Sequence, residues 1–121
     1  MNTLRKDLLL YHGRELIARV RAYTAEGKAH FFADLKTQDA VLRNIEIIGQ
    51  IVRDLQIDWL HEQYPTLPWR QITGMRNIIA HAYLGIELAE VWNTVERDLA
   101  DLDTAFAHIA TVHGFTPFSG A

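Results

Sequence analysis

The sequence predicts an all-α protein, folded as an up-down bundle of four main helices with short helices between them. Three observations predict this class: apolar residues recur at helical spacings of three, four and seven, no alternating β pattern of useful length appears, and 49% of the residues are apolar, enough for a core. The length of 121 residues suits one compact domain, and no repeat or linker divides it. We expect a single domain over residues 1–121, with a loose C-terminal tail at 113–121.

The first half of the chain predicts two long helices. The first covers about residues 4–24, with Gly27 as its stop, and a short helix or bend at residues 30–32 is expected to plug the core. The second long helix should follow Thr37, whose hydroxyl can satisfy free backbone donors as an N-cap. Its apolar stripe consists of Val41, Ile45, Ile48, Val52 and Leu55. Gly49 sits inside that stripe at a cost of about 1 kcal/mol relative to alanine, and its expected use is the close approach of another helix.

The second half predicts a connection followed by two further helices. Residues 57–68 contain about one turn of helix and two prolines, of which Pro68 can open a helix over residues 69–80. Gly85 breaks that pattern. A last long helix is expected over residues 87–112. Its apolar stripe consists of Val91, Val95, Leu99, Leu102, Phe106 and Ile109.

Composition excludes several classes of protein. A net charge of −3 and a pI of about 6.0 argue against a general DNA or RNA binder with a broad basic surface, although a small basic site remains open. The absence of cysteine excludes disulfides, thiolate metal sites and cysteine nucleophiles, and fits a reducing cytoplasm. No stretch approaches the roughly 20 apolar residues of a membrane span, and the N-terminal apolar patch is too short for a signal peptide.

Functional groups gather most densely at residues 76–83. Arg76, Asn77, His81 and Tyr83 lie there beside an apolar run that would anchor the segment in a core. Arginine can hold a phosphate through two hydrogen bonds and stabilise charge in a transition state, and asparagine can orient a phosphate oxygen. Histidine can act as base or acid near neutral pH. In RNA, removal of the 2′-hydroxyl proton lets that oxygen attack the adjacent phosphorus without a metal, so the cluster suits binding or cleaving a phosphodiester.

A regular helix would keep Arg76 and His81 apart within one chain. Arg76 and His81 would lie roughly 140° apart around a regular helix, whereas Arg76 and Tyr83 would nearly eclipse. An intrachain site therefore needs the helix to end or distort around Ala80, or a second copy must supply the missing group. We favour both, a helix end on a twofold axis where two copies face one another. A purely structural reading, with helix-end capping, a surface ion pair and a half-buried Tyr83, stays open.

Other polar side chains have simpler interpretations. Arg43 and Glu46 are three apart on a helix and form either a structural ion pair or part of an RNA cleft. The arginines of the first helix suggest a solvated face, an RNA contact or a contact with an acidic protein. No metal site is expected, because the histidines lack a ligand spacing; they are His12, His30, His61, His108 and His113. The tryptophans are expected to be core or interface anchors; they are Trp59, Trp69 and Trp92.

The order of residues 76–83 resembles a known family signature. Arg76, four further residues, His81, Ala82 and Tyr83 match the arginine, any four residues, histidine, any residue, tyrosine pattern of HEPN-domain toxins, and are most similar to the HepT-like branch. Residues 39–49 resemble that branch's second helix, and the runs at 67–69, 72–75, 91–92 and 99–102 match its remaining pattern. The resemblance covers nearly all of residues 4–112.

This resemblance implies a homodimeric ribonuclease without a cofactor, the toxin of a type VII-like toxin–antitoxin pair. Its implied partner is a minimal nucleotidyltransferase antitoxin, which attaches AMP to Tyr83. Carried over to this chain, Arg76 and His81 are catalytic and Asn77 supports them. AMP on Tyr83 would place bulk and a negative phosphate beside Arg76.

One position departs from the branch. Gln50 follows the glycine of the second helix, where the branch usually has glutamate, so Glu46 or Asp39 would have to contribute any carboxylate. Two other functions stay open beside the ribonuclease: a non-catalytic module that binds a nucleotide or a partner, and a plain helical interaction protein whose signature is merely a helix end.

Overall fold

The computed structural model describes residues 5–75, 79–80, 84 and 87–115. All regular structure among these residues is helical, which confirms the predicted all-α class. The elements are α1 (Lys6–Tyr23), α2 (Lys28–Ala33), α3 (Leu35–Leu55), α4 (Ile57–Gln63), α5 (Trp69–Thr73), α7 (Leu88–Asn93), the π-helical segment η1 (Thr94–Asp98) and α8 (Leu99–Val112). Within this described part, none of the helices combines the length and the apolar character needed to cross a bilayer.

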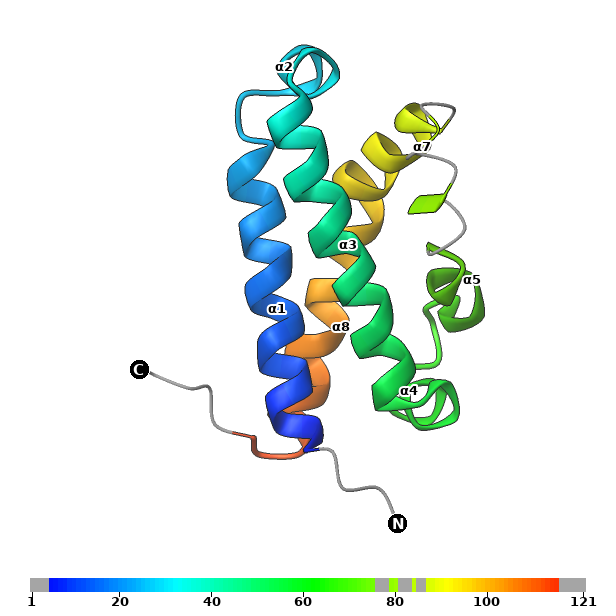
Figure 1. Ribbon diagram of the computed structural model, residues 1–121. Helices are drawn as coiled ribbons and strands as arrows, with labels where there is room; N and C mark the ends of the chain where they lie inside the picture. Colours follow the sequence, from blue (N-terminus) through cyan, green and yellow to red (C-terminus); the bar gives the residue numbers. More distant parts are fainter. Residues whose placement is uncertain (1–4, 76–78, 81–83, 85–86, 116–121) are drawn as a thin grey trace.

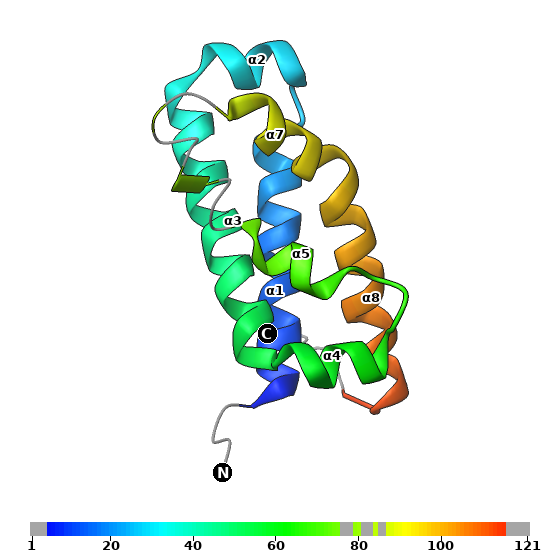
Figure 2. The ribbon, with the colours of Figure 1, turned by 90° about the vertical axis from the view of Figure 1, so that its right-hand side faces the viewer.

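The long helices run up and down beside one another. In Figure 1, α1 and α3 lie side by side in opposite directions, with α8 behind them. Helices α5 and α7 lie on the other side of α3 from α1, and the view turned by 90° brings them to the front, with α4 crossing one end of the bundle (Figure 2). The chain between α5 and α7 therefore connects two elements on one side of the molecule, and α1 occupies the opposite side.

The predicted apolar stripes form the core. Every stripe residue of α3 and of the α7–η1–α8 run is buried, with Val95 the most exposed at 8%. Helix α1 contributes its own buried row, made of Leu10, Leu16, Ile17 and Val20. The short helix α2 plugs one end as expected, because Phe31 is fully buried and its ring lies 5.3 Å from that of Trp92. Trp69 is also buried, so two of the three tryptophans are core anchors.

A close approach of helices occurs at Gly13 of α1. A Cβ atom there would lie 2.7 Å from Cε2 of Phe106 and 3.6 Å from Cγ2 of Ile51, so α8 and α3 occupy the space that a side chain would fill. The Phe106 ring in turn stacks on Trp69 of α5, with ring centroids 6.4 Å apart. Gly49, for which the sequence predicted this role, is buried in α3.

Asp34 is the N-cap of α3, so the prediction of Thr37 was wrong. The Asp34 carboxylate accepts hydrogen bonds from the Thr37 backbone N–H at 3.2 Å and from its hydroxyl at 2.5 Å. Both hydrogen bonds hold the pKa of Asp34 below its ordinary value, and the bond from the Thr37 hydroxyl has the larger effect. Helix α3 therefore begins at Leu35, and Thr37 supplies the donors of its first turn.

Two other helices depart from regular continuation. The helix expected over residues 69–80 ends at Thr73, because Gly74 forms a turn in which its N–H bonds to the Gln71 carbonyl, and helix resumes at Met75. The last helix spans the expected range but widens into a π turn at η1. Val91, Val95 and Leu99 are each four residues apart, more than one α turn, and the wider turn keeps all three on the buried side.

Helix α8 ends in a Schellman motif. The Phe115 N–H bonds to the Ala110 carbonyl at 2.9 Å, the Gly114 N–H bonds to the Thr111 carbonyl at 3.1 Å, and Gly114 has a φ of 69°. Phe115 packs against the core. The first residues of the expected loose tail are therefore a structured cap.

Replacing Gly13 with alanine should destabilise the fold. Overpacking against the buried Phe106 ring is expected to outweigh the better helix propensity of alanine, for a net loss of about 1–2 kcal/mol in the free energy of unfolding. Urea unfolding followed by circular dichroism, at one fixed protein concentration, measures it. The matched control is Ala22→Gly at an exposed position of α1, which should lose no more than about 1 kcal/mol through helix propensity alone. A Gly13→Ala variant as stable as the parent would contradict the close approach.

Candidate functional site

The sequence-predicted site centres on residues that the structure does not describe. Arg76, Asn77, His81 and Tyr83 all lie outside the described residues. Their roles therefore stay predictions, and the geometry available is that of the residues around them.

The described neighbours within this segment attach it to the core. Met75 and Ile79 are 5% and 3% exposed, and each is helical. Met75 also lines a small cavity of about 170 Å³ together with Leu99 and Leu102 of α8. Ala80 is exposed, and Leu84 is 73% exposed. The segment is thus held at Met75 and Ile79 and reaches the surface at Ala80 and Leu84.

Helix α3 carries the three supporting residues proposed from the sequence. Arg43 Nη1 lies 2.8 Å from Glu46 Oε1, which confirms that the two side chains pair. The pair is open to solvent, because the Arg43 side chain is 69% exposed and the Glu46 side chain 38%. Asp39 is exposed and lies seven residues before Glu46, so the two carboxylates share one side of α3. Gln50 donates its amide to Asp54 at 3.0 Å on the same exposed surface.

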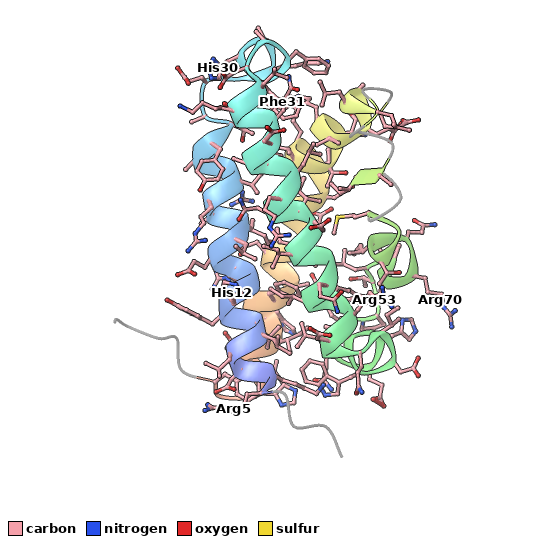
Figure 3. All side chains as sticks on the ribbon, viewed as in Figure 1. Arg5, His12, His30, Phe31, Arg53 and Arg70 are labelled. Atoms are coloured by element: carbon pink, nitrogen blue, oxygen red, sulfur yellow. The ribbon has the colours of Figure 1, made fainter. Side chains whose placement is uncertain are left out.

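Two arginines that the sequence analysis did not single out lie on the side of the molecule that carries α5. Arg53 of α3 and Arg70 of α5 both extend into solvent in Figure 3. Within the described part of the chain, neither forms an ion pair with a carboxylate, unlike Arg14, Arg19 and Arg43. Their cationic groups are therefore available to an anionic ligand, although Asp58 and Glu62 lie beside Arg70 in the same shallow pocket. The lack of a nearby partner becomes visible only in three dimensions.

Three of the histidines outside the signature have ordinary polar partners. His12 and His30 lie near the carboxylates of Glu15 and Glu26, at 3.4 and 3.1 Å. His113 shares a 2.7 Å hydrogen bond with Gln63. Over the residues for which coordinates are described, no three histidine, aspartate or glutamate side chains come together as a metal site would require.

Comparison with known proteins assigns the family. The family model described as Ribonuclease HepT-like matches residues 14–109, a range that includes α3 and the whole signature. This chain belongs to the HepT-like ribonuclease family. The resemblance seen in residues 39–49 and 76–83 is thereby confirmed.

Three curated relatives of the HepT-like chain are named as ribonucleases. A Methanocaldococcus jannaschii protein, named as a gamma-glutamylcyclotransferase and candidate RNase, is 35% identical over 82% of this chain and 46% of its own length. A Thermococcus cleftensis protein named as a probable ribonuclease HepT is 38% identical over 63% of this chain and 68% of its own. A candidate RNase of Caldanaerobacter subterraneus is 32% identical over 73% and 75%. The chain thus spans less than half of the first relative, and no solved structure matches it significantly.

The Arg43–Glu46 pair should contribute little to stability. Arg43→Ala and Glu46→Ala are each expected to change the free energy of unfolding by less than about 1 kcal/mol, because the ion pair is exposed. The thermal unfolding of both variants is measured and compared with that of Gln50→Ala. This third variant breaks the Gln50–Asp54 hydrogen bond of the same helix. A loss above about 2 kcal/mol for either variant would mean that the pair holds the fold together, and these variants would then be unsuited to functional assays.

Proposed function

We propose that this protein is a metal-independent endoribonuclease that acts as a homodimer and as the toxin of a type VII-like toxin–antitoxin pair in the cytoplasm. The observation that carries the proposal is the family match over residues 14–109, which includes Arg76, His81 and Tyr83 in the order of the signature. The names of the three relatives support RNA as the substrate. The burial of Met75 and Ile79 supports attachment of this part of the chain to the core.

The proposed reaction is attack of the RNA 2′-oxygen on its own 3′-phosphate. His81 of one protomer removes the 2′-hydroxyl proton, the 2′-oxygen bonds to phosphorus, and the bond to the 5′-oxygen of the next nucleotide breaks. The second copy's imidazole, in its protonated form, donates a proton to that leaving oxygen. Arg76 binds the phosphate and stabilises its growing negative charge, while Asn77 orients it. The products are a cyclic phosphate and a free 5′-hydroxyl, so no water or metal ion enters the step.

The proposed neutralisation is adenylylation of Tyr83 by a nucleotidyltransferase antitoxin. The Tyr83 oxygen attacks the α-phosphorus of ATP, and pyrophosphate leaves. The attached AMP would place a phosphate and a nucleoside on a residue that lies seven positions after Arg76 in the sequence. There the AMP phosphate would compete with the RNA phosphate for the Arg76 guanidinium, and the nucleoside would block RNA binding. The exposure of Leu84 is consistent with enzyme access to the residue before it.

A non-catalytic module that binds a nucleotide or a partner is the second candidate. It is favoured by Gln50, which replaces a carboxylate usual in the branch and whose amide bonds to Asp54. A purified dimer that binds nucleotides and cleaves no RNA would support this alternative.

Arg76→Ala and His81→Ala should each abolish RNA cleavage by the purified protein, by at least about 100-fold, while leaving the helical content unchanged. Cleavage by the parent should persist in excess EDTA if no metal takes part. An equimolar mixture of the parent and His81→Ala, unfolded and refolded together, should keep about a quarter of the parent activity rather than about half, because mixed dimers would hold only one of the two imidazoles that a cleavage step uses. Full activity in either single variant would refute the assignment, and a mixture that keeps about half of the activity would refute the shared cleft.

Tyr83→Phe should escape modification. Incubation of the parent with its nucleotidyltransferase and ATP is expected to add whole AMP units in intact-mass spectrometry and to stop RNA cleavage, whereas Tyr83→Phe should keep its mass and its activity. Tyr11→Phe serves as the matched control and should be modified like the parent. An AMP-sized mass increase in Tyr83→Phe would show that another residue accepts the nucleotide.

A further inference from the structure

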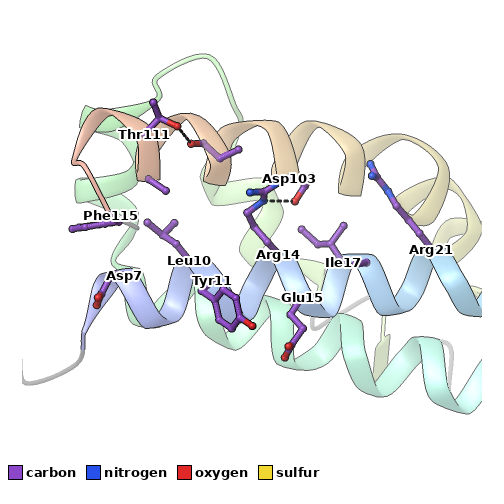
Figure 4. A pocket seen from close by; sticks show the side chains of 13 residues that line it. Asp7, Leu10, Tyr11, Arg14, Glu15, Ile17, Arg21, Asp103, Thr111 and Phe115 are labelled. Atoms are coloured by element: carbon purple, nitrogen blue, oxygen red, sulfur yellow. Dashed lines mark hydrogen bonds and ion pairs between the residues drawn. The ribbon is translucent and has the colours of Figure 1, made fainter. Parts of the chain in front are cut away.

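A groove of about 620 Å³ runs between α1 and α8, on the side of the bundle away from α5. Figure 4 shows Leu10 and Ile17 pointing from α1 into the space between the two helices, where each is only 1% exposed. Its walls are low where Ala18 of α1 and Ala107 of α8 face it. The groove therefore offers an apolar floor along most of the length of α1, with no element of the described chain lying over it.

Charged residues are ordered along this groove. Asp7, Arg14 and Arg21 each lie seven residues apart on α1, so they follow one line along the helix, about 10.5 Å from one to the next. Arg14 crosses the groove to Asp103 of α8, with Nε and Oδ1 2.9 Å apart (Figure 4). Asp7 pairs with Arg5 at the helix start. Among the described residues Arg21 has no carboxylate partner, so the Arg5–Asp7 ion pair and an unpaired positive end lie on either side of a neutralised centre.

We propose that a second copy of this chain docks in the groove, with its α1 antiparallel to the first and a twofold axis passing through Arg14. In this register the numbers of facing residues add up to 28. Asp7 of each copy then faces Arg21 of the other, which gives each unpaired arginine a carboxylate. Both Arg14 side chains meet near the axis, where each already carries its Asp103 and has Glu15 one residue away.

The same register matches side-chain size as well as charge. Tyr11, which is partly exposed, lies over the groove floor of the second copy at Ile17, and the small, exposed Ala18 lies over its floor at Leu10. An arrangement about a twofold axis makes every such contact twice, which is how a modest patch becomes a stable isologous interface. A parallel arrangement would instead set Asp7 against Asp7 and Arg21 against Arg21.

This interface is distinct from the homodimer proposed for RNA cleavage. Helix α1 and the elements around Met75 lie on opposite sides of α3, so one protomer can use both faces at once (Figure 1). Its failure would leave the proposed ribonuclease activity untouched, and Arg76→Ala, which tests that activity, should keep association through α1.

Charge exchange tests the proposal in the full-length protein. Arg21→Glu should lower the mass found by sedimentation equilibrium about twofold relative to the parent, because it sets a second carboxylate against Asp7 of the other copy. Asp7→Lys should do the same, whereas the double variant Asp7→Lys/Arg21→Glu should restore the parent mass by re-creating both pairs in reverse. Lys36→Glu is the matched control: it makes the same charge change at an exposed position of α3 that does not line the groove, and its mass should stay that of the parent.

Disulfide trapping gives a second test, because the chain contains no cysteine. Under oxidation Arg14→Cys should form a covalent dimer, since residue 14 faces its own copy at the axis. Ala22→Cys on the same helix should form none, because the two copies of residue 22 would be about 24 Å apart, beyond the roughly 7 Å that a disulfide can bridge. A double charge variant that stays as dissociated as Arg21→Glu, or cysteines that cross-link equally at 14 and 22, would overturn the proposal, as would a parent no heavier than Arg21→Glu.

Discussion

The contact on which the arrangement of helices depends is the insertion of the Phe106 ring into the space beside Gly13. It lets α1 approach α8 more closely than any side chain at position 13 would allow, and the same ring supports Trp69 from the other side. Trp69 begins α5, and α5 leads through the Gly74 turn to the buried Met75. One aromatic ring therefore connects the helix that carries the apolar groove with the element that precedes the signature.

Periodicity was sufficient to predict the fold, because burial of one face is a property that each helix expresses in its own residues. The stripes of α3 and of the 88–112 run were correct to the residue, and α2 and α4 lie where the sequence placed them. The errors fall where two local solutions compete. Asp34 and Thr37 are both good N-caps, and Asp34 prevails because Thr37 can then donate two hydrogen bonds to it. Gly74 and the π turn depend on how the helices pack, which periodicity does not report.

Less of the candidate site than of the fold could be predicted from the sequence. Residue types and order pointed to Arg76, His81 and Tyr83, and the family match covers all three positions. Pairing was predictable where partners are three apart, as for Arg43 and Glu46. The sequence could not show that Arg53 and Arg70 find no carboxylate partner among the described residues, because that depends on which carboxylates the fold brings near. Arg14, by contrast, finds its partner 89 residues away. The glycines show the same limit: the sequence singled out Gly49 for a close helix contact, whereas the structure has such a contact at Gly13, which depends on how the helices pack.

Electrostatics explains why assembly matters for a chain of this composition. With a net charge of −3, the protein cannot attract RNA through its overall field, and intramolecular ion pairs already occupy Arg14, Arg19 and Arg43. Binding of a polyanion must therefore depend on a few local cations. A twofold axis brings twice as many of these cations to one place without changing the net charge per protomer. An axis at the signature and an axis at Arg14 would lie on opposite sides of α3. Two such isologous contacts generate either a closed tetramer or an open chain, and the angle between the two axes decides which.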